Sequence, residues 1–188
     1  MGDRVPDFVC ISFQNLTDDA VLPKNCTYRH AAVLATLRKR RRTRPATLAK
    51  QLYMDVERLR PLLNDLVASG AVIENPTGSL SLSTFWSELK AEVIAVEAKL
   101  TRWKDALIQA LSHKRYADTA VVAMDAAAIP QKESSIRTFA EHGIGLCAIS
   151  PDSARWVVPP KRSEGEGHER EYLLTSALSP SQTLWSRL

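Results

Sequence analysis

Apolar residues recur at helical spacing along the first half of the chain. The stretch HAAVLATLRKRRR places its apolar residues on one side, with polar residues between and after them. Two further stretches with this spacing follow, one from Pro45 over PATLAKQLYM and one from Asp55 to about Ser69. Thr43 and Asp55 are the expected caps of these two helices, and Gly70 is the expected stop of the last one. The pattern therefore predicts three short helices in succession.

After Gly70 the period of the apolar positions changes from helical to alternating. AVIENPTGSLSLS indicates strand, turn and strand, with the turn at Asn75 to Gly78. Strands and helices then alternate over VIAVEAKL, WKDALIQALSHKRYA, TAVVAMD, ESSIRTFAEHG, GLCAIS and RWVVPP. Such alternation is typical of a mixed α/β sandwich with parallel strand pairs.

These patterns predict five segments along the chain. They are an N-terminal strand or arm over 1–27, a helical module with a hairpin over 28–82, an α/β domain over 83–161, a charged linker over 162–170, and a C-terminal helix or tail over 171–188. The last segment carries Leu173, Leu174, Leu178, Leu184 and Trp185. This apolar set either covers the protein's own core or docks on a second copy, and we expect a homodimer.

Composition narrows the class of protein. With 45% apolar and 24% charged residues the chain is expected to be a soluble globular protein. No apolar run approaches the roughly 18 residues needed to cross a bilayer, so we expect no membrane partner and a cytoplasmic location. Cys10, Cys26 and Cys147 are widely spaced and form no Cys/His cluster, which argues against structural zinc.

The positive charge is concentrated in one part of the chain. The net charge is +4, but residues 29–60 hold ten Lys and Arg against two acidic residues, or +8, which leaves −4 for the remainder. A basic segment in an otherwise mildly acidic chain indicates a local site for a polyanion, although a solvated helix end would have the same composition.

Candidate chemistry lies on the strand VIAVEAKL. Glu97 and Lys99 are two residues apart, so they share one face with Val93 and Ala95, whereas the opposite face is wholly apolar. A carboxylate and an ammonium in this position suit a Mg²⁺ site, in which Glu97 is a hard oxygen ligand and Lys99 steadies the attacking water or the phosphate charge. The alternative is that both simply lie where the strand reaches solvent.

The helical module resembles a winged helix-turn-helix domain, with TRPATLAKQLYMDVERLRPLLNDLVASGAVIE similar to its second helix, turn, third helix and first wing strand. The resemblance implies DNA binding by the third helix, whose base-reading candidates here are Arg58, Arg60 and Asn64. It also places a basic cluster near the phosphate backbone: Arg38, Lys39, Arg40, Arg41, Arg42 and Arg44. The alternative is a winged helix that contacts proteins.

The α/β segment EAKLTRWKDALIQALSHKRYAD resembles the core of the PD-(D/E)xK nucleases, in which the ExK strand leads into a helix beside the active site. The resemblance implies that Gln109 and Tyr116 face the metal or the DNA. The family also has an acid on the strand before ExK, usually after proline, but LSTFWSELKAEVIAV contains no Asp. Glu88 and Glu92 are candidates for this acid. Asp7, in the Pro-Asp pair of RVPDFVCISF, serves only if the helical module is inserted into the nuclease core.

Two hypotheses follow for the function. In the first, a winged helix delivers a Mg²⁺-dependent phosphodiesterase to DNA. In the second, the chain is a transcriptional regulator or scaffold, and its inactive nuclease fold serves for dimerisation.

Overall fold

The structure is a computed structural model that describes residues 5–16, 22–23 and 25–179. The described residues form two compact units. The first combines Met1–Ser12 with Glu92–Gly165, and the second combines Phe13–Ala91 with Glu166–Leu188. The chain thus passes from the first unit to the second, back to the first and again to the second. Residues 180–188, including Leu184 and Trp185 of the expected C-terminal apolar set, lie outside the described residues.

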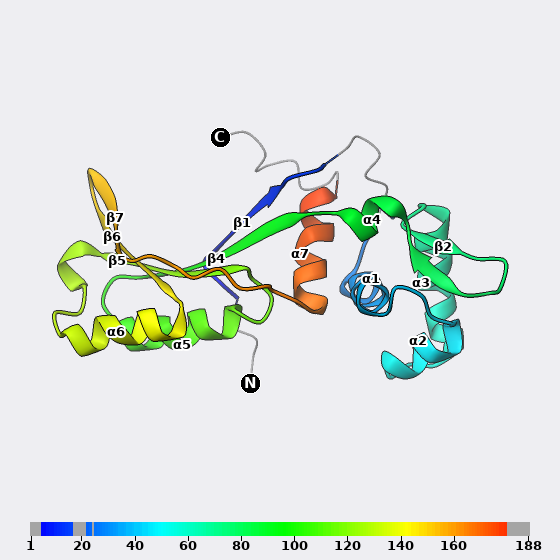
Figure 1. Ribbon diagram of the computed structural model, residues 1–188, viewed down its shortest axis with the longest axis horizontal. Coiled ribbons are helices and arrows are strands. Elements are labelled where there is room, and N and C mark those ends of the chain that lie inside the picture. The colour runs from blue at the N-terminus through cyan, green and yellow to red at the C-terminus, as the bar shows by residue number, and fades with distance from the viewer. Residues whose placement is uncertain (1–4, 17–21, 24, 180–188) are drawn as a thin grey trace. The chain divides into compact units, whose positions relative to one another are not determined.

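The second unit contains three helices followed by a hairpin (Figure 1). Its elements are α1 (Tyr28–Arg40), α2 (Pro45–Gln51), α3 (Val56–Ala68), β2 (Val72–Glu74), β3 (Leu80–Leu82), α4 (Thr84–Glu88) and α7 (His168–Leu178). Strands β2 and β3 pair antiparallel, and Gly78 closes their turn at φ +70 with its N–H on the Asn75 carbonyl. The three helices and the hairpin arise where the apolar pattern predicts them.

Local details of this unit differ from the sequence expectations. Arg44, not Thr43, precedes α2 as its N-cap. The Thr43 main chain instead exchanges hydrogen bonds with Leu80 at 2.7 and 3.0 Å, so Thr43 extends the hairpin. In α3 the leucines of the apolar stripe are buried, but Val56 at its start is 37% exposed.

Helix α7 packs along α1 and contributes Leu174 and Thr175 to the interior of the second unit. The guanidinium of Arg38 on α1 holds the buried carboxylate of Glu171 by two hydrogen bonds, at 2.8 and 3.0 Å. Of the described members of the C-terminal apolar set, Leu174 is therefore in the core of this unit, whereas Leu173 and Leu178 are half-buried. Helix α7 begins at His168, inside the segment 162–170 for which the sequence indicates a linker.

The first unit is a five-stranded mixed sheet with two helices on one face (Figure 1). Its elements are β1 (Phe8–Phe13), β4 (Ala91–Lys99), α5 (Trp103–His113), β5 (Thr119–Asp125), η1 (Ala126–Ala128), α6 (Glu133–His142), β6 (Gly145–Ser150) and β7 (Ser153–Val158). The strand order is β1-β4-β5-β6-β7. Strands β4, β5 and β6 are parallel, as the alternating pattern predicts, and β7 returns antiparallel to β6.

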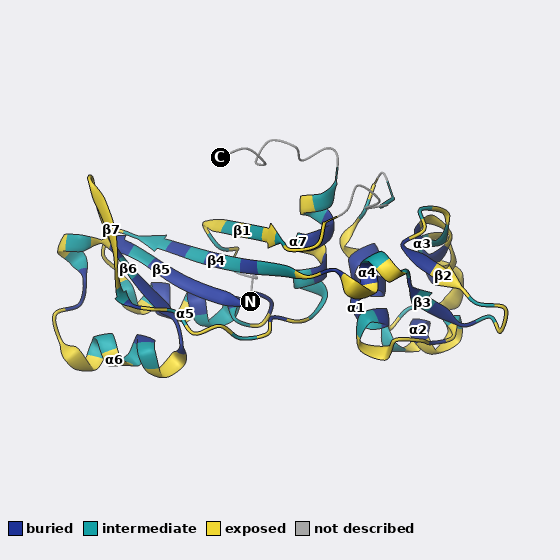
Figure 2. Ribbon diagram, turned by 45° about the horizontal axis from the view of Figure 1, so that its top comes forward, coloured by how far each residue is buried: buried dark blue, intermediate teal, exposed yellow. Residues whose placement is uncertain are grey.

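The core of the first unit lies between the sheet and the helices α5 and α6, and Figure 2 shows the inner strands buried and much of α6 exposed. Along β4 the buried residues are Val93, Ala95 and Glu97, whereas Ile94, Val96 and Ala98 are half-buried. The face that carries Glu97 is therefore the one that the helices cover. As a result, Glu97 is placed inside the protein and not at the solvent end of the strand.

Residues just before α7 are packed into this first unit. The buried Asp118 carboxylate accepts the Val93 N–H at 2.8 Å and the Gly165 N–H at 3.2 Å. A Cβ on Gly165 would lie 2.3 Å from the Tyr116 carbonyl oxygen, so only glycine fits there. Part of the expected linker is therefore fixed by Asp118.

Candidate active site and candidate nucleic-acid interface

Strand β4 brings Glu97 and Lys99 to one face of the sheet, because side chains two residues apart in a strand point the same way. The Glu97 side chain is 1% exposed and that of Lys99 is 29% exposed. The Lys99 ammonium donates to Glu97 Oε1. This hydrogen bond and the charge of Glu97, with a smaller contribution from Asp7, raise the pKa of Lys99 above its ordinary value. Lys99 is thus a cation held against a buried carboxylate.

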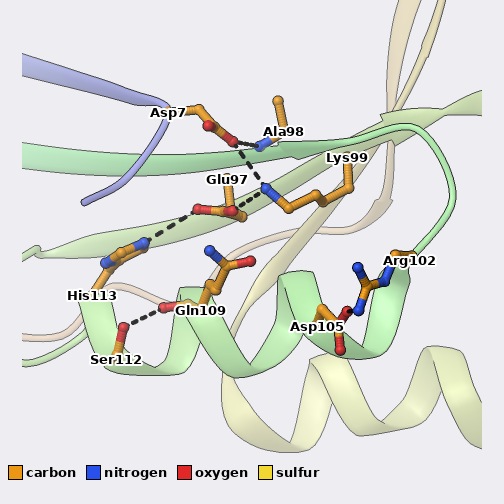
Figure 3. Close-up of polar contacts among 9 residues, drawn as sticks. All are labelled: Asp7, Glu97, Ala98, Lys99, Arg102, Asp105, Gln109, Ser112 and His113. Carbon is orange, nitrogen blue, oxygen red and sulfur yellow. Dashed lines mark hydrogen bonds and ion pairs between the residues drawn. The ribbon is translucent and has the colours of Figure 1, made fainter. Parts of the chain in front are cut away.

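Asp7 reaches the same lysine from the neighbouring strand. It directly precedes β1, which lies beside β4 in the sheet. The Asp7 carboxylate accepts the Ala98 N–H at 2.8 Å and lies 3.5 Å from Lys99 Nζ (Figure 3). Two carboxylates, Asp7 and Glu97, therefore converge on one ammonium, although 89 residues separate them in the chain.

Neither of the other two candidate acids is among the described ion-pair partners of Lys99. Glu88 is the last residue of α4 and belongs to the second unit. Glu92 is on β4 but an odd number of residues from Glu97, so it points to the opposite face, and its carboxylate lies 4.0 Å from Arg162. Asp7 is thus the acid that the structure places beside Lys99.

Helix α5 covers this site with one of its faces. Gln109 extends from α5 toward Glu97 and is half-buried (Figure 3). One turn later, Nε2 of the buried His113 lies 3.4 Å from Glu97 Oε2. Tyr116 lies beyond the end of α5 and is buried, and its hydroxyl meets His113 Nδ1 at 2.9 Å. Tyr116 therefore reaches Glu97 through His113.

No sequence motif assigns a role to His113. The signal for it was present, because Gln109 and His113 are four residues apart and so share a helix face. Spacing alone does not show that this face meets Glu97.

A concavity adjoins the site at the carboxyl ends of β4, β5 and β6. Its volume is about 430 Å³, and Lys99, Leu100, Asp125 and Ile149 are among the residues that line it. Ligands of open sheets with parallel strands commonly bind at this end. Lys99 belongs to both the carboxylate site and the concavity, so a ligand there would meet its ammonium.

The chemistry of the donors suits a divalent cation. Within the described ranges no group of three or more His, Cys, Asp and Glu side chains encloses a metal position. The site offers two carboxylates that already converge on a cation, the Lys99 ammonium. Mg²⁺ in proteins is commonly held by one or two carboxylates, with water and substrate phosphate as further ligands. Asp7 and Glu97 therefore fit the ion that the sequence analysis expects.

The basic cluster of the second unit is divided into two groups. Arg38 is half-buried and is bound to the buried Glu171, so it stabilises the packing of α7. Lys39 lies 2.8 Å from the exposed Glu166. The remaining four arginines of the cluster are exposed: Arg40, Arg41, Arg42 and Arg44.

The base-reading candidates on α3 are all exposed. Two ion pairs lie at the start of α3. Arg60 is 3.4 Å from Glu57, and Arg58 is 3.9 Å from Asp55. Arg60 and Asn64 line a groove of about 590 Å³ beside the hairpin. Exposed ion pairs of this kind contribute little to stability, so both arginines can exchange these partners for a ligand.

Comparisons with known proteins leave the family open. No protein-family model matches the chain, and no curated protein matches it. One solved structure that resembles it is the reduced form of MarR from E. coli, with a TM-score of 0.31 and 19% sequence identity, over 82% of this chain and 75% of that one. A TM-score of this size does not establish a common fold. Among the described residues, no helix combines the length and apolar character needed to span a bilayer.

Proposed function

We propose that this chain binds DNA through its second unit and that its first unit is a divalent-cation-dependent phosphodiesterase. The observation that carries the proposal is the convergence of Asp7, directly before β1, and Glu97, on the neighbouring strand β4, on the Lys99 ammonium. Pro6-Asp7 and Glu97-x-Lys99 together supply the residue types of the nuclease motif that the sequence resembles. In this proposal Asp7, directly before β1, would supply the acid that is missing from the segment before Glu97.

Each side chain of the site has a distinct task in this proposal. Asp7 and Glu97 would hold the cation, which when bound would polarise the phosphodiester and acidify a water molecule. Lys99 places a positive charge where the phosphate gains negative charge, and such preorganised charge stabilises the transition state. The Ala98 N–H fixes the orientation of the Asp7 carboxylate. The Gln109 amide can donate to a phosphate oxygen or accept from a water molecule.

The choice of DNA as substrate rests on the second unit. Four exposed arginines follow one another at the end of α1 and before α2, and like charges this close repel one another in the free protein. A polyanion relieves the repulsion and releases its counterions on binding. The succession of three helices and a hairpin adds an exposed helix, α3, with Arg58, Arg60 and Asn64 available to base edges.

The test of the enzymatic part is incubation of the full chain with single- and double-stranded DNA in Mg²⁺ or Mn²⁺. We expect strand cleavage that chelation abolishes. Intact DNA in every condition, from a preparation that binds Mn²⁺, would exclude the phosphodiesterase and leave the second proposal below.

The DNA-binding part predicts a specific salt dependence. If the four exposed arginines meet phosphates, log K should fall with log salt with a slope of about −3.6, since each neutralised phosphate contributes about −0.9. The triple variant Arg40→Ala, Arg41→Ala, Arg42→Ala should retain a slope of about −0.9 and bind all sequences more weakly. Arg137→Ala, which removes an exposed arginine from α6, is the control and should leave the slope unchanged. A triple variant with the wild-type slope would show that the cluster does not contact the backbone.

A second proposal is a DNA-binding regulator that does not cleave, with its first unit used for assembly into a homodimer. It is favoured by the position of Lys99, whose ammonium compensates the charge of both carboxylates. Dimeric helix-turn-helix proteins bind two DNA half-sites about one helical turn apart, so footprinting should show a site with two-fold symmetry. A chain that stays monomeric on such DNA would contradict this proposal.

A further inference from the structure

A buried chain of hydrogen bonds leads from Glu97 into the interior of the first unit. Glu97 Oε2 meets Nε2 of His113 at 3.4 Å, and Nδ1 of His113 meets the Tyr116 hydroxyl at 2.9 Å. All three residues are buried, with His113 completely inaccessible. Figure 3 shows His113 on one side of Glu97, with Lys99 and Asp7 on the other.

The two partners of His113 determine which ring nitrogen carries the proton. The acceptor-only carboxylate of Glu97 lies at Nε2 of the ring, and the Tyr116 hydroxyl lies at Nδ1. A neutral ring has one donor and one acceptor nitrogen. Glu97 can only accept, so Nε2 must carry the proton, and Nδ1 then accepts from the Tyr116 hydroxyl. The opposite tautomer would direct a lone pair at a buried carboxylate.

The two oxygens of Glu97 consequently have separate partners. His113 binds Oε2 from the interior, and Lys99 binds Oε1 on the side that faces Asp7. A carboxylate bound at one oxygen by a rigid ring cannot rotate freely, so Oε1 stays directed toward Asp7 and Lys99. A histidine with its second nitrogen also bound is itself held in one orientation.

We propose that His113 and Tyr116 are positioning residues that orient Glu97 for cation binding. His113 acts through Glu97, and Tyr116 acts by holding the His113 ring in place through Nδ1. The inference rests on the proposed function, because it assigns these residues to the cation site described there. The orientation of Glu97 by His113 and Tyr116 goes beyond the proposed function, which requires only Asp7, Glu97 and Lys99.

The first test compares Mn²⁺ affinities by calorimetry on the full chain. His113→Leu, which removes the donor, should weaken binding by about 10- to 100-fold, the usual effect of losing a group that orients a ligand. His113→Gln should stay close to wild type, because its side-chain amide can still donate to Glu97. Tyr116→Phe should give an intermediate loss, since Nδ1 loses its partner and the ring of His113 is held less firmly. Ser112→Ala on the same helix is the control, because the Ser112 hydroxyl donates only to the Gln109 carbonyl.

The outcomes separate this inference from the proposed function. Wild-type protein that binds no Mn²⁺ would overturn the cation site itself. Wild-type binding with equal affinity in His113→Leu would overturn the positioning role and leave the site intact. If His113→Leu does not fold, the Mn²⁺ affinities of His113→Gln and Tyr116→Phe test the positioning role. Equal losses of affinity in both variants would indicate general damage to packing and would overturn that role.

The second test does not depend on any cation. Nitrogen chemical shifts of labelled histidine in the metal-free protein report which ring nitrogen is protonated. We expect the proton of His113 on Nε2 in the wild type and also in Tyr116→Phe, because Glu97 still lies at Nε2 and can only accept. A proton on Nδ1 in the wild type would overturn the inference, because His113 could then not donate to Glu97.

Discussion

Asp7→Asn should lower the rate of DNA cleavage by about 10²-fold or more, because a cation site contributes several kcal/mol to catalysis and each 1.36 kcal/mol is about tenfold. The asparagine oxygen can still accept the Ala98 N–H, so the contact between β1 and β4 persists while the negative charge is lost. Glu97→Gln and Lys99→Ala should cause losses of similar size. In all three variants DNA binding should remain near the wild-type level, since the exposed arginines are unchanged.

The matched control is Glu92→Gln on the same strand. Glu92 lies on the opposite face of β4, near Arg162, and its loss should leave the cleavage rate within about twofold, as expected for a partly exposed ion pair. The measurement is the single-turnover rate on a labelled duplex. An active Asp7→Asn beside an inactive Glu97→Gln would mean that another acid completes the site and that Asp7 only joins the strands.

Arg38→Met should destabilise the second unit by about 3–5 kcal/mol, the usual cost of leaving one partner of a buried ion pair without the other. Glu171 has a side chain only 2% exposed, and the Arg38 guanidinium holds both of its oxygens. Methionine retains the apolar stem of arginine but not its charge. The carboxylate must then either stay charged in the interior or take up a proton, and both outcomes weaken the packing of α7 on α1.

Hydrogen exchange of the α1 and α7 amides measures this effect, because two units need not unfold together. Arg42→Ala is the control from the same basic cluster, and this exposed residue should change stability by no more than about 0.5 kcal/mol. If Arg38→Met exchanges like wild type but binds DNA with a smaller salt slope, Arg38 belongs with the phosphate-contacting arginines after all.

Local patterns along the chain were sufficient to predict most of the elements. TAVVAMD and GLCAIS become strands with the expected bounds, and the apolar spacing that ends near Gly70 yields α3 and then the hairpin. Short-range signals, such as the alternation of apolar and polar residues in a strand and a glycine directly after a helix, suffice for these segments. The caps were less predictable, because Thr43 has a tertiary partner in Leu80 that no local pattern reveals.

The candidate site depends on contacts between distant parts of the chain. Glu97 and Lys99 could be proposed from one strand, and their placement on a common face follows from its geometry. Whether Asp7 joins them depends on β1 pairing with β4 across the whole helical module, which the sequence left open. Likewise, the run from Arg38 to Arg44 appears uniform in sequence, and only the return of α7 separates Arg38 from the exposed arginines.

The structure of the protein in crystals soaked with Mn²⁺ tests the carboxylate pair most directly. We predict anomalous density in contact with both Asp7 and Glu97, and movement of the Lys99 ammonium away from its present position between them. Density that touches neither carboxylate, or density at Glu97 completed by an acid other than Asp7, would contradict the assignment of these two residues as the cation site.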